Sequence, residues 1–261
     1  MKLAAQENMI PGESLSDKLA KMESYGFRGI EFWGRDLPAR VEEVQEALES
    51  SSISPSTICA GYSGCLLDTD RAEREKAMKD IKSLLEAGGE LGVVGLITVP
   101  IFGKPRLPDL SPLRSPVDME KDLLTAELKE LAGFADDAGC EILLEPLNRY
   151  ETHLLRTLEH GMEIQQRVGA ESIKIMADFF HMSIEERDIA ASLRAAGDAV
   201  HHIHLADSTR LLPGHGHTDF KSGFAALKEI GYDRYMALEC GIPGDPDVEL
   251  PKSVEYLESC M

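Results

Sequence analysis

The sequence predicts an α/β fold, a single (β/α)8 TIM barrel that spans residues 1–261. Short apolar segments typical of β-strands alternate with longer segments whose apolar residues recur every three to four positions, as in amphipathic helices. Strict alternation indicates a parallel sheet, and eight strand–helix pairs in about 250 residues are typical of this barrel. A doubly wound sheet is the alternative, but it gives no reason for eight units.

The expected strands are the apolar, β-rich runs, and an amphipathic segment follows each one. They cover residues 2–6, 29–33, 53–59, 93–99, 140–146, 172–179, 199–206 and 234–240. Several of the intervening helical segments end at a glycine, the residue most often found directly after a helix: Gly26, Gly139, Gly169, Gly197 and Gly231.

The longest irregular segment is the Pro-rich stretch 101–118, which follows the fourth expected strand. Loops after the strands of a barrel lie on the face where active sites are built. A long ordered loop in this place is often a lid or a wall of the binding site. We therefore expect residues 101–118 to form an active-site loop.

Composition and charge exclude several classes of function. Acidic residues outnumber basic ones by 46 to 27, which gives a net charge of −19 and makes nucleic acid an unfavourable partner. No apolar run approaches the roughly 20 residues of a membrane span, so no membrane association is expected. The N-terminal segment lacks the apolar stretch of a secretory signal, and the five cysteines form no metal or disulfide pattern. The expected location is cytoplasmic.

Polar residues stand at the ends of four consecutive expected strands. Each follows an apolar run: Glu145, Asp178, His204 and Glu239 end the fifth to eighth strands in turn. In a barrel, the carboxyl ends of the strands converge on one mouth, where the chemistry is carried out. We expect these four side chains to face one another there.

Three carboxylates and an imidazole at one mouth predict a metal site. Buried carboxylates that lie close together repel one another unless some are protonated or a cation is present. A divalent ion removes this conflict, and an oxygen-rich set with one imidazole favours Mn²⁺ or Mg²⁺, with Co²⁺ or Zn²⁺ as alternatives. The sequence therefore predicts one divalent metal ion held by these four residues.

Two neighbours of His204 have expected supporting roles. His202 lies two residues earlier in the same strand, so it points to the same face one layer deeper, where it packs in the core or supports a ligand. Asp207 lies three residues after His204 and is placed to orient an imidazole, as carboxylates around metal sites often do.

Four segments resemble the xylose isomerase-like barrels known as sugar phosphate isomerases/epimerases. They are LEPLNRYE (144–151), ADFFHM (177–182), HIHLADSTR (202–210) and ALEC (237–240). The similarity is closest to the ketose 3-epimerase and hydroxypyruvate isomerase-like branch and covers essentially the whole chain. The loops after the first three strands match no single activity of the family, so the substrate is left open.

This resemblance implies one divalent ion, often Mn²⁺, held by the same four strand-end residues. It further implies that three residues contact the substrate. Glu151 would meet the substrate terminus, His181 would contact the substrate, and Arg210 would bind a hydroxyl and brace a catalytic carboxylate.

The expected chemistry is proton transfer next to a carbonyl. Glu145 and Glu239, on opposite sides of a bound sugar, would remove and return the proton, while the ion stabilises an enediolate. Return on the other face gives epimerisation, and return to the neighbouring carbon gives aldose–ketose isomerisation. A dehydratase that acts on an inosose- or dehydroshikimate-type substrate would use the same site and is the principal alternative.

Two further alternatives are less favoured. An apurinic endonuclease on this fold would need histidine ligands from early strands, but His153 is the first histidine of the chain. A non-catalytic sugar-binding protein would not be expected to keep every expected site residue. The implied partner is a small sugar or sugar-like molecule, and the family implies a homodimer or homotetramer. Basic residues leave a phosphorylated substrate open: Lys104, Arg106, Arg114, Arg149 and Arg156.

Overall fold

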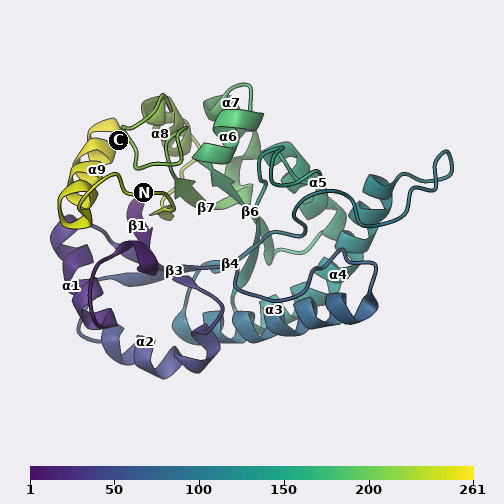
Figure 1. The fold of residues 1–261 in the computed structure, drawn as a ribbon, viewed down its shortest axis with the longest axis horizontal. Coiled ribbons are helices and arrows are strands. Elements are labelled where there is room, and N and C mark those ends of the chain that lie inside the picture. Colours follow the sequence, from purple (N-terminus) through teal and green to yellow (C-terminus); the bar gives the residue numbers. More distant parts are fainter.

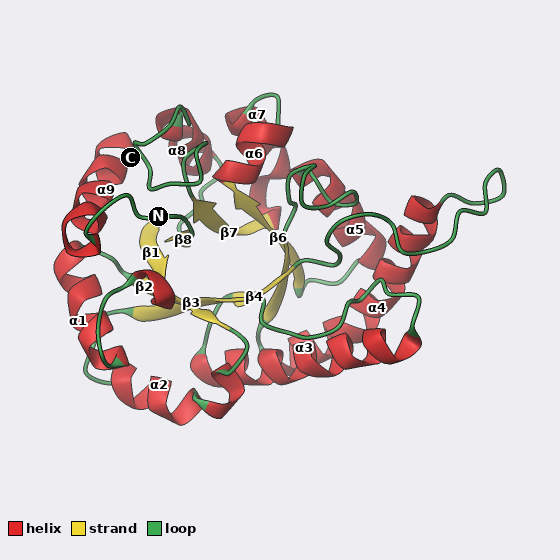
Figure 2. Cartoon of the chain, viewed as in Figure 1, coloured by secondary structure: helices red, strands yellow, loops and turns green.

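The computed structural model describes residues 1–261 and shows a closed barrel of eight parallel strands in chain order (Figures 1 and 2). The strands are β1 (Lys2–Gln6), β2 (Gly29–Trp33), β3 (Ser54–Cys59), β4 (Gly95–Thr98), β5 (Glu141–Leu144), β6 (Ile173–Asp178), β7 (Val200–Leu205) and β8 (Tyr235–Leu238). β1 pairs with β8, for example Ala4 with Ala237, and this pairing closes the sheet. The predicted (β/α)8 barrel is confirmed, and the doubly wound alternative is wrong because that sheet would be open.

Helices surround the barrel on its outer face (Figure 2). They are α1 (Leu15–Tyr25), α2 (Val41–Leu48), α3 (Arg71–Leu91), α4 (Pro116–Ala138), α5 (Leu158–Val168), α6 (Phe179–Glu185), α7 (Ile189–Ala196), α8 (Phe220–Glu229) and α9 (Pro246–Cys260), with the short 3-10 helices η1 (Glu7–Met9), η2 (Leu37–Ala39) and η3 (Gly197–Ala199). None of these helices combines the length and the apolar character needed to cross a membrane.

Local sequence signals set the helix ends. α1 begins with a capping box, in which the Ser14 hydroxyl accepts from the Asp17 amide and the Asp17 carboxylate accepts from the Ser14 amide. α4 and α5 begin at the capping side chains of Ser115 and Thr157. α4 ends at Gly139, whose left-handed backbone (φ 67°) is readily adopted by glycine. These signals fix where each helix starts and stops, and so how long each loop at the mouth is.

The barrel interior has an apolar part and a polar part. Cys59, Ile97, Leu143 and Met176 form a small buried cluster of their own, separate from the larger core between the strands and the helices. Buried polar side chains on β1, β2, β3 and β7 occupy the remaining interior: Gln6, Glu31, Thr57, His202 and His204. An interior that holds this many polar groups requires nearly complete hydrogen bonding among them, because unpaired buried groups are costly.

The segment after β4 only partly agrees with the expected active-site loop. Its base is anchored beside the β5 loop, where the Thr152 hydroxyl donates to the carbonyl of Ile101 (2.8 Å) and Gly103 bridges to Thr152. Its tip, around the Leu110–Arg114 bridge, projects sideways and away from the strands (Figure 1). The tip therefore does not cover the mouth, and only the base of segment 101–118 stays a candidate wall of the site.

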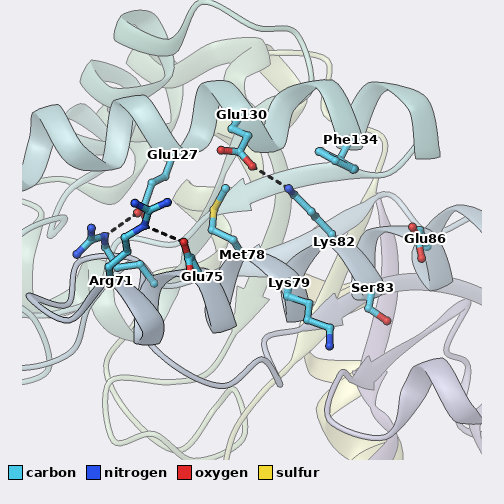
Figure 3. Close-up of a pocket in the computed structure, with 11 residues that line it drawn as sticks. Arg71, Glu75, Met78, Lys79, Lys82, Ser83, Glu86, Glu127, Glu130 and Phe134 are labelled. Carbon is cyan, nitrogen blue, oxygen red and sulfur yellow. Dashed lines mark hydrogen bonds and ion pairs between the residues drawn. The ribbon is translucent and has the colours of Figure 1, made fainter.

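A cavity of about 760 Å³ lies outside the barrel, between α3 and α4 (Figure 3). Ion pairs cross it, including Arg74–Glu127 (3.3 Å) and Lys82–Glu130 (2.8 Å). The second carboxylate oxygen of Glu127 is buried without a hydrogen-bond partner. Burial raises the pKa of Glu127 to about 7, although Arg74 acts in the opposite direction.

This pKa shift predicts a pH-dependent effect of Glu127→Gln. The native carboxyl holds its proton up to about pH 7, whereas the unfolded chain loses it near pH 4.5, so the wild-type protein loses stability as pH rises through this window. The amide does not titrate. Relative to the wild type, we expect the variant to gain about 1 kcal/mol in free energy of unfolding between pH 5 and pH 8, allowing for solvent screening. Urea unfolding at both pH values measures this, and a difference independent of pH would contradict it.

Candidate metal centre and active site

Four side chains from consecutive strands meet at the mouth of the barrel. Glu145 directly follows β5, Asp178 is the last residue of β6, His204 lies near the end of β7, and Glu239 directly follows β8. One ligand atom from each lies within 4.8 Å of the others. Three of the four are buried, and the side chain of Glu239 is 20% exposed. The structure therefore brings together the whole set of expected metal ligands.

The donor atoms of this cluster fit a single divalent cation. His204 Nδ1 lies 3.4 Å from Glu239 Oε2 and 3.9 Å from both Glu145 Oε1 and Asp178 Oδ2. His204 Nδ1 and Asp178 Oδ2 are buried without any hydrogen-bond partner. A buried polar atom left unpaired costs about 1–3 kcal/mol. A cation held between these atoms would satisfy both of them and offset the repulsion among the three carboxylates.

The two candidate catalytic carboxylates have opposite electrostatic surroundings. Burial raises the pKa of Glu145 well above its usual value, and the nearby Glu239 and Asp178 raise it further. Burial acts on Glu239 in the same direction, but His204 and Arg210 outweigh it and lower the pKa of Glu239. Two carboxyl groups with separated pKa values are the arrangement that acid–base catalysis requires.

The imidazole of His204 has a carboxylate on its other side as well. Its Nε2 lies 3.0 Å from both oxygens of Glu31, a fully buried residue of β2. Gln6 of β1 donates to Glu31 (2.9 Å) and to Glu239 (3.2 Å). The sequence reasoning missed Glu31 and Gln6. A usable signal was present for Glu31, because it is the one charged residue in the otherwise apolar strand GIEFW.

His202 lies in the barrel interior, as expected from the alternation along β7. Its Nε2 is 2.9 Å from Glu31 Oε2 and 3.3 Å from the hydroxyl of Thr57, and its ring packs edge-on against the ring of His204. Burial lowers the pKa of His202 despite the attraction of Glu31. His202 therefore supports His204 in two ways: the two rings pack together, and both imidazoles contact Glu31.

The three expected substrate-contacting residues line the same mouth. Arg210 donates to Glu239 (2.8 Å), stacks on the ring of Phe180 (4.6 Å to its centroid) and lies 3.1 Å from His181 Nε2. The amide group of Asn148 donates to Glu151 (2.9 Å), and the same side chain lies 2.8 Å from His181 Nδ1. Arg210 therefore braces a carboxylate, as the resemblance implied, while any contact of these residues with a substrate stays a prediction.

Asp207 has a different role from the one expected. Its carboxylate accepts hydrogen bonds from the backbone amides of Ser208, Gly214 and Thr218 at 2.8–3.0 Å, and from no imidazole. The prediction that it orients a histidine is wrong, because three residues beyond His204 the chain has already left the strand and turned into a loop. Asp207 instead holds together the loop that carries Arg210, whose backbone adopts a left-handed conformation (φ 58°).

Trp33, the only tryptophan, lies at the open mouth. It points to the same side as Glu31, because side chains two residues apart on a strand share a face. Its register partner on β3 is Cys59, whose Sγ lies 3.7 Å from Glu239 Oε1. The side chain of Trp33 is 48% exposed. An aromatic face is thus available to a molecule that enters the mouth.

The cluster predicts a specific effect of Asp178→Asn. Asp178 Oδ1 caps α6 by accepting from the amides of Phe180 and His181, while Oδ2 faces the other ligands. Asparagine caps helices equally well, so we expect the metal-free variant to be at least as stable as the wild type. We expect Mn²⁺ affinity to fall about 100-fold, so that a given concentration of Mn²⁺ raises the melting temperature much less than in the wild type.

Asp188→Asn is the matched control, because Asp188 caps the neighbouring helix α7 through one backbone amide and lies outside the cluster. Calorimetry without Mn²⁺ compares the melting temperatures of the metal-free proteins, and calorimetry with Mn²⁺ compares how far the ion raises them. Equal Mn²⁺ stabilisation of the wild type and the Asp178 variant would contradict the assignment of Asp178 as a ligand.

Comparison with known proteins gives consistent results. A family model described as a xylose isomerase-like TIM barrel matches residues 19–260. The 3-dehydro-D-guloside 4-epimerase of Escherichia coli is 32% identical over 263 residues, which cover 100% of both chains. The crystal structure of 3-keto-D-glucoside 4-epimerase from E. coli superposes with a TM-score of 0.91 over 100% of both chains, also at 32% identity. A D-psicose 3-epimerase of Enterocloster bolteae is 38% identical over 112 residues, 43% of this chain and 37% of its own.

The chain therefore belongs to the xylose isomerase-like TIM barrel family. The relatives are epimerases, which confirms the resemblance to sugar isomerases and epimerases and the expectation that the protein is an enzyme of this class.

Proposed function

We propose that this member of the family is a divalent-metal-dependent sugar epimerase that transfers a proton next to a carbonyl group. The observation that carries the proposal is the cluster of Glu145, Asp178, His204 and Glu239, in which two buried ligand atoms have no hydrogen-bond partner. Mn²⁺ or Mg²⁺ suits this oxygen-rich set best. When bound, the ion would polarise a substrate carbonyl and stabilise the enediolate that forms when the neighbouring C–H loses its proton.

The two carboxylates divide the proton transfer between them. Glu239 is the base, because His204 and Arg210 keep it ionised in spite of its burial. Glu145 lies on the opposite side of the substrate, where it would return a proton to the carbon, so it must carry that proton when the reaction begins. Removal of the proton on one face and its return on the other inverts the carbon, which is epimerisation. The reverse reaction exchanges the two roles.

The residues around this pair orient the sugar and keep it in place. Arg210 reaches Glu239 and His181 at the same time, so a substrate hydroxyl beside it would meet both the guanidinium and the imidazole. Glu151, 40% exposed in its side chain, offers a carboxylate to the outer end of the sugar. In this role the three residues supply orientation, while Glu145 and Glu239 move the proton.

Three of the five basic residues that could have bound a phosphate are already paired with carboxylates, which favours a substrate without a phosphate group. Arg106 pairs with Asp68, Arg114 with Asp122, and Arg149 with Glu185. A phosphate would have to compete with each of these carboxylates. One relative that covers the full chain is a 3-dehydro-D-guloside 4-epimerase, and a solved structure that does so is a 3-keto-D-glucoside 4-epimerase, so 3-keto-D-glycosides are the first substrates to test. The cytoplasmic location and a homodimer or homotetramer stay predictions.

Solvent deuterium exchange tests the proposed function. In D₂O with Mn²⁺, we expect deuterium to enter a carbon next to the carbonyl of a 3-keto-D-glycoside or a ketose, as followed by ¹H NMR. Glu145→Gln and Glu239→Gln should each lower the exchange rate by about 10²–10⁴-fold, the usual contribution of general acid–base catalysis.

The product spectrum separates epimerisation from isomerisation and from loss of water, which would indicate a dehydratase. Asp188→Asn should exchange at the wild-type rate. No exchange on any of these sugars, in a folded protein that binds one equivalent of Mn²⁺, would contradict the proposed chemistry while leaving the metal site in place.

Trp33 offers an independent measure of sugar binding. Because the chain has one tryptophan and its side chain is half exposed at the mouth, a sugar ring that packs on it should change its fluorescence. We expect methyl 3-keto-D-glucoside to shift the emission to shorter wavelength in a saturable way. Trp33→Phe should remove the signal and keep most of the activity. Turnover of this sugar with no change in emission would contradict the placement of the sugar against Trp33.

A further inference from the structure

We infer that Glu31 is a positioning residue for the metal site: its carboxylate holds the Nε2–H of His204 and thereby presents the Nδ1 lone pair to the ion. The inference concerns residues beyond the four ligands, and it rests on the proposed metal dependence. It assigns a purpose to a fully buried carboxylate that takes no part in the proton transfer described above.

The geometry around Glu31 is that of an anion surrounded by donors. Gln6 donates to Oε1 (2.9 Å), Thr57 donates to Oε2 (2.6 Å), and His202 Nε2 lies 2.9 Å from Oε2. His204 Nε2 lies 3.0 Å from each oxygen. With this many donors from β1, β3 and β7, the carboxylate has little freedom to rotate away from His204.

The contact with Glu31 decides which nitrogen of His204 faces the cluster as an acceptor. A neutral imidazole carries one N–H, and a carboxylate can only accept a hydrogen bond. When His204 is neutral, as a metal ligand must be, its proton lies on Nε2, where the oxygens of Glu31 are closest (3.0 Å), and Nδ1 is left with a free lone pair. Nδ1 is the atom that lies 3.4–3.9 Å from the three carboxylate ligands and has no partner. A carboxylate on the far nitrogen also makes an imidazole a stronger ligand.

Gln6 extends the same support to a second ligand. Its amide group contacts Glu31 and Glu239 together, at 2.9 and 3.2 Å. One carboxylate in the barrel interior thus helps to place two of the four ligands, one directly and one through an amide.

The group formed by Glu31, His202 and His204 also has the composition of a second cation site. The contacts favour a positioning role for Glu31 over a second cation site, because its two oxygens already accept hydrogen bonds, one from Gln6 and one from Thr57. Metal stoichiometry distinguishes the two arrangements. Positioning requires one ion per chain, and two tightly bound ions per chain would overturn the inference.

Mn²⁺ affinity of Glu31→Gln is the decisive measurement, made by competition with a chromophoric chelator in the absence of any sugar. Loss of a carboxylate behind a histidine ligand typically weakens metal binding by 10–100-fold, and this is the expected result. The matched control is Glu120→Gln, which removes another fully buried carboxylate that pairs with a histidine, His153 (2.6 Å), and that is not a member of the cluster. Both variants should lower the melting temperature of the metal-free protein, but only Glu31→Gln should change the Mn²⁺ affinity.

The ¹⁵N NMR signals of His204 provide a readout that a general loss of stability would not move. In the metal-free wild type at alkaline pH they should show hydrogen on Nε2, and in Glu31→Gln this preference should weaken. If Glu31→Gln does not fold, the Mn²⁺ affinity of Thr57→Val is measured instead. This variant removes one hydrogen-bond donor from Glu31, and we expect it to weaken Mn²⁺ binding at least threefold. Affinity within twofold of the wild type in the folded variant, or hydrogen on Nδ1 in the wild type, would overturn the inference. Because no substrate is used, this failure would leave the proposed epimerase activity untouched.

Discussion

The gathering of four carboxylates, three of them buried, around one imidazole is the constraint on which the rest of this structure depends. Glu145, Asp178 and Glu239 face Nδ1 of His204, and Glu31 faces Nε2. Charges in a protein interior are costly unless they are paired, hydrogen-bonded or bound to a cation. The barrel provides hydrogen bonds for Glu31 and a guanidinium for Glu239, and it leaves His204 Nδ1 and Asp178 Oδ2 without a hydrogen-bond partner. This arrangement is unfavourable for a protein that binds nothing there and favourable for one that binds a divalent ion.

Sequence reasoning found the fold and the four strand-end residues because both follow from local patterns. The alternation of strands and helices can be read along the chain, and a carboxylate or imidazole that ends an apolar strand, such as Asp178 after IKIMA, is a local anomaly. The barrel then brings these anomalies to one mouth by symmetry, since equivalent strand ends lie in one ring. No contact had to be known in advance for Glu145 or Glu239 to be named.

The residues that were missed or misread depend on contacts between distant segments. Gln6 meets Glu239 because the closure of the barrel places β1 beside β8, 233 residues apart in the chain. The role of Glu31 follows from its contact with His204, which lies 173 residues later in the chain. Asp207 was misread because spacing from His204 says nothing about the turn that follows β7, which directs its carboxylate into its own loop. The direction of the loop tip near Leu110 is likewise not encoded in the Pro-rich composition of its segment.

The most direct test of the central claim is anomalous diffraction at the manganese edge from crystals grown with Mn²⁺. We predict one strong peak per chain, within bonding distance of carboxylate oxygens of Glu145, Asp178 and Glu239 and of His204 Nδ1. A peak on the Nε2 side of His204, or no peak in this cluster while Mn²⁺ is bound elsewhere, would contradict it.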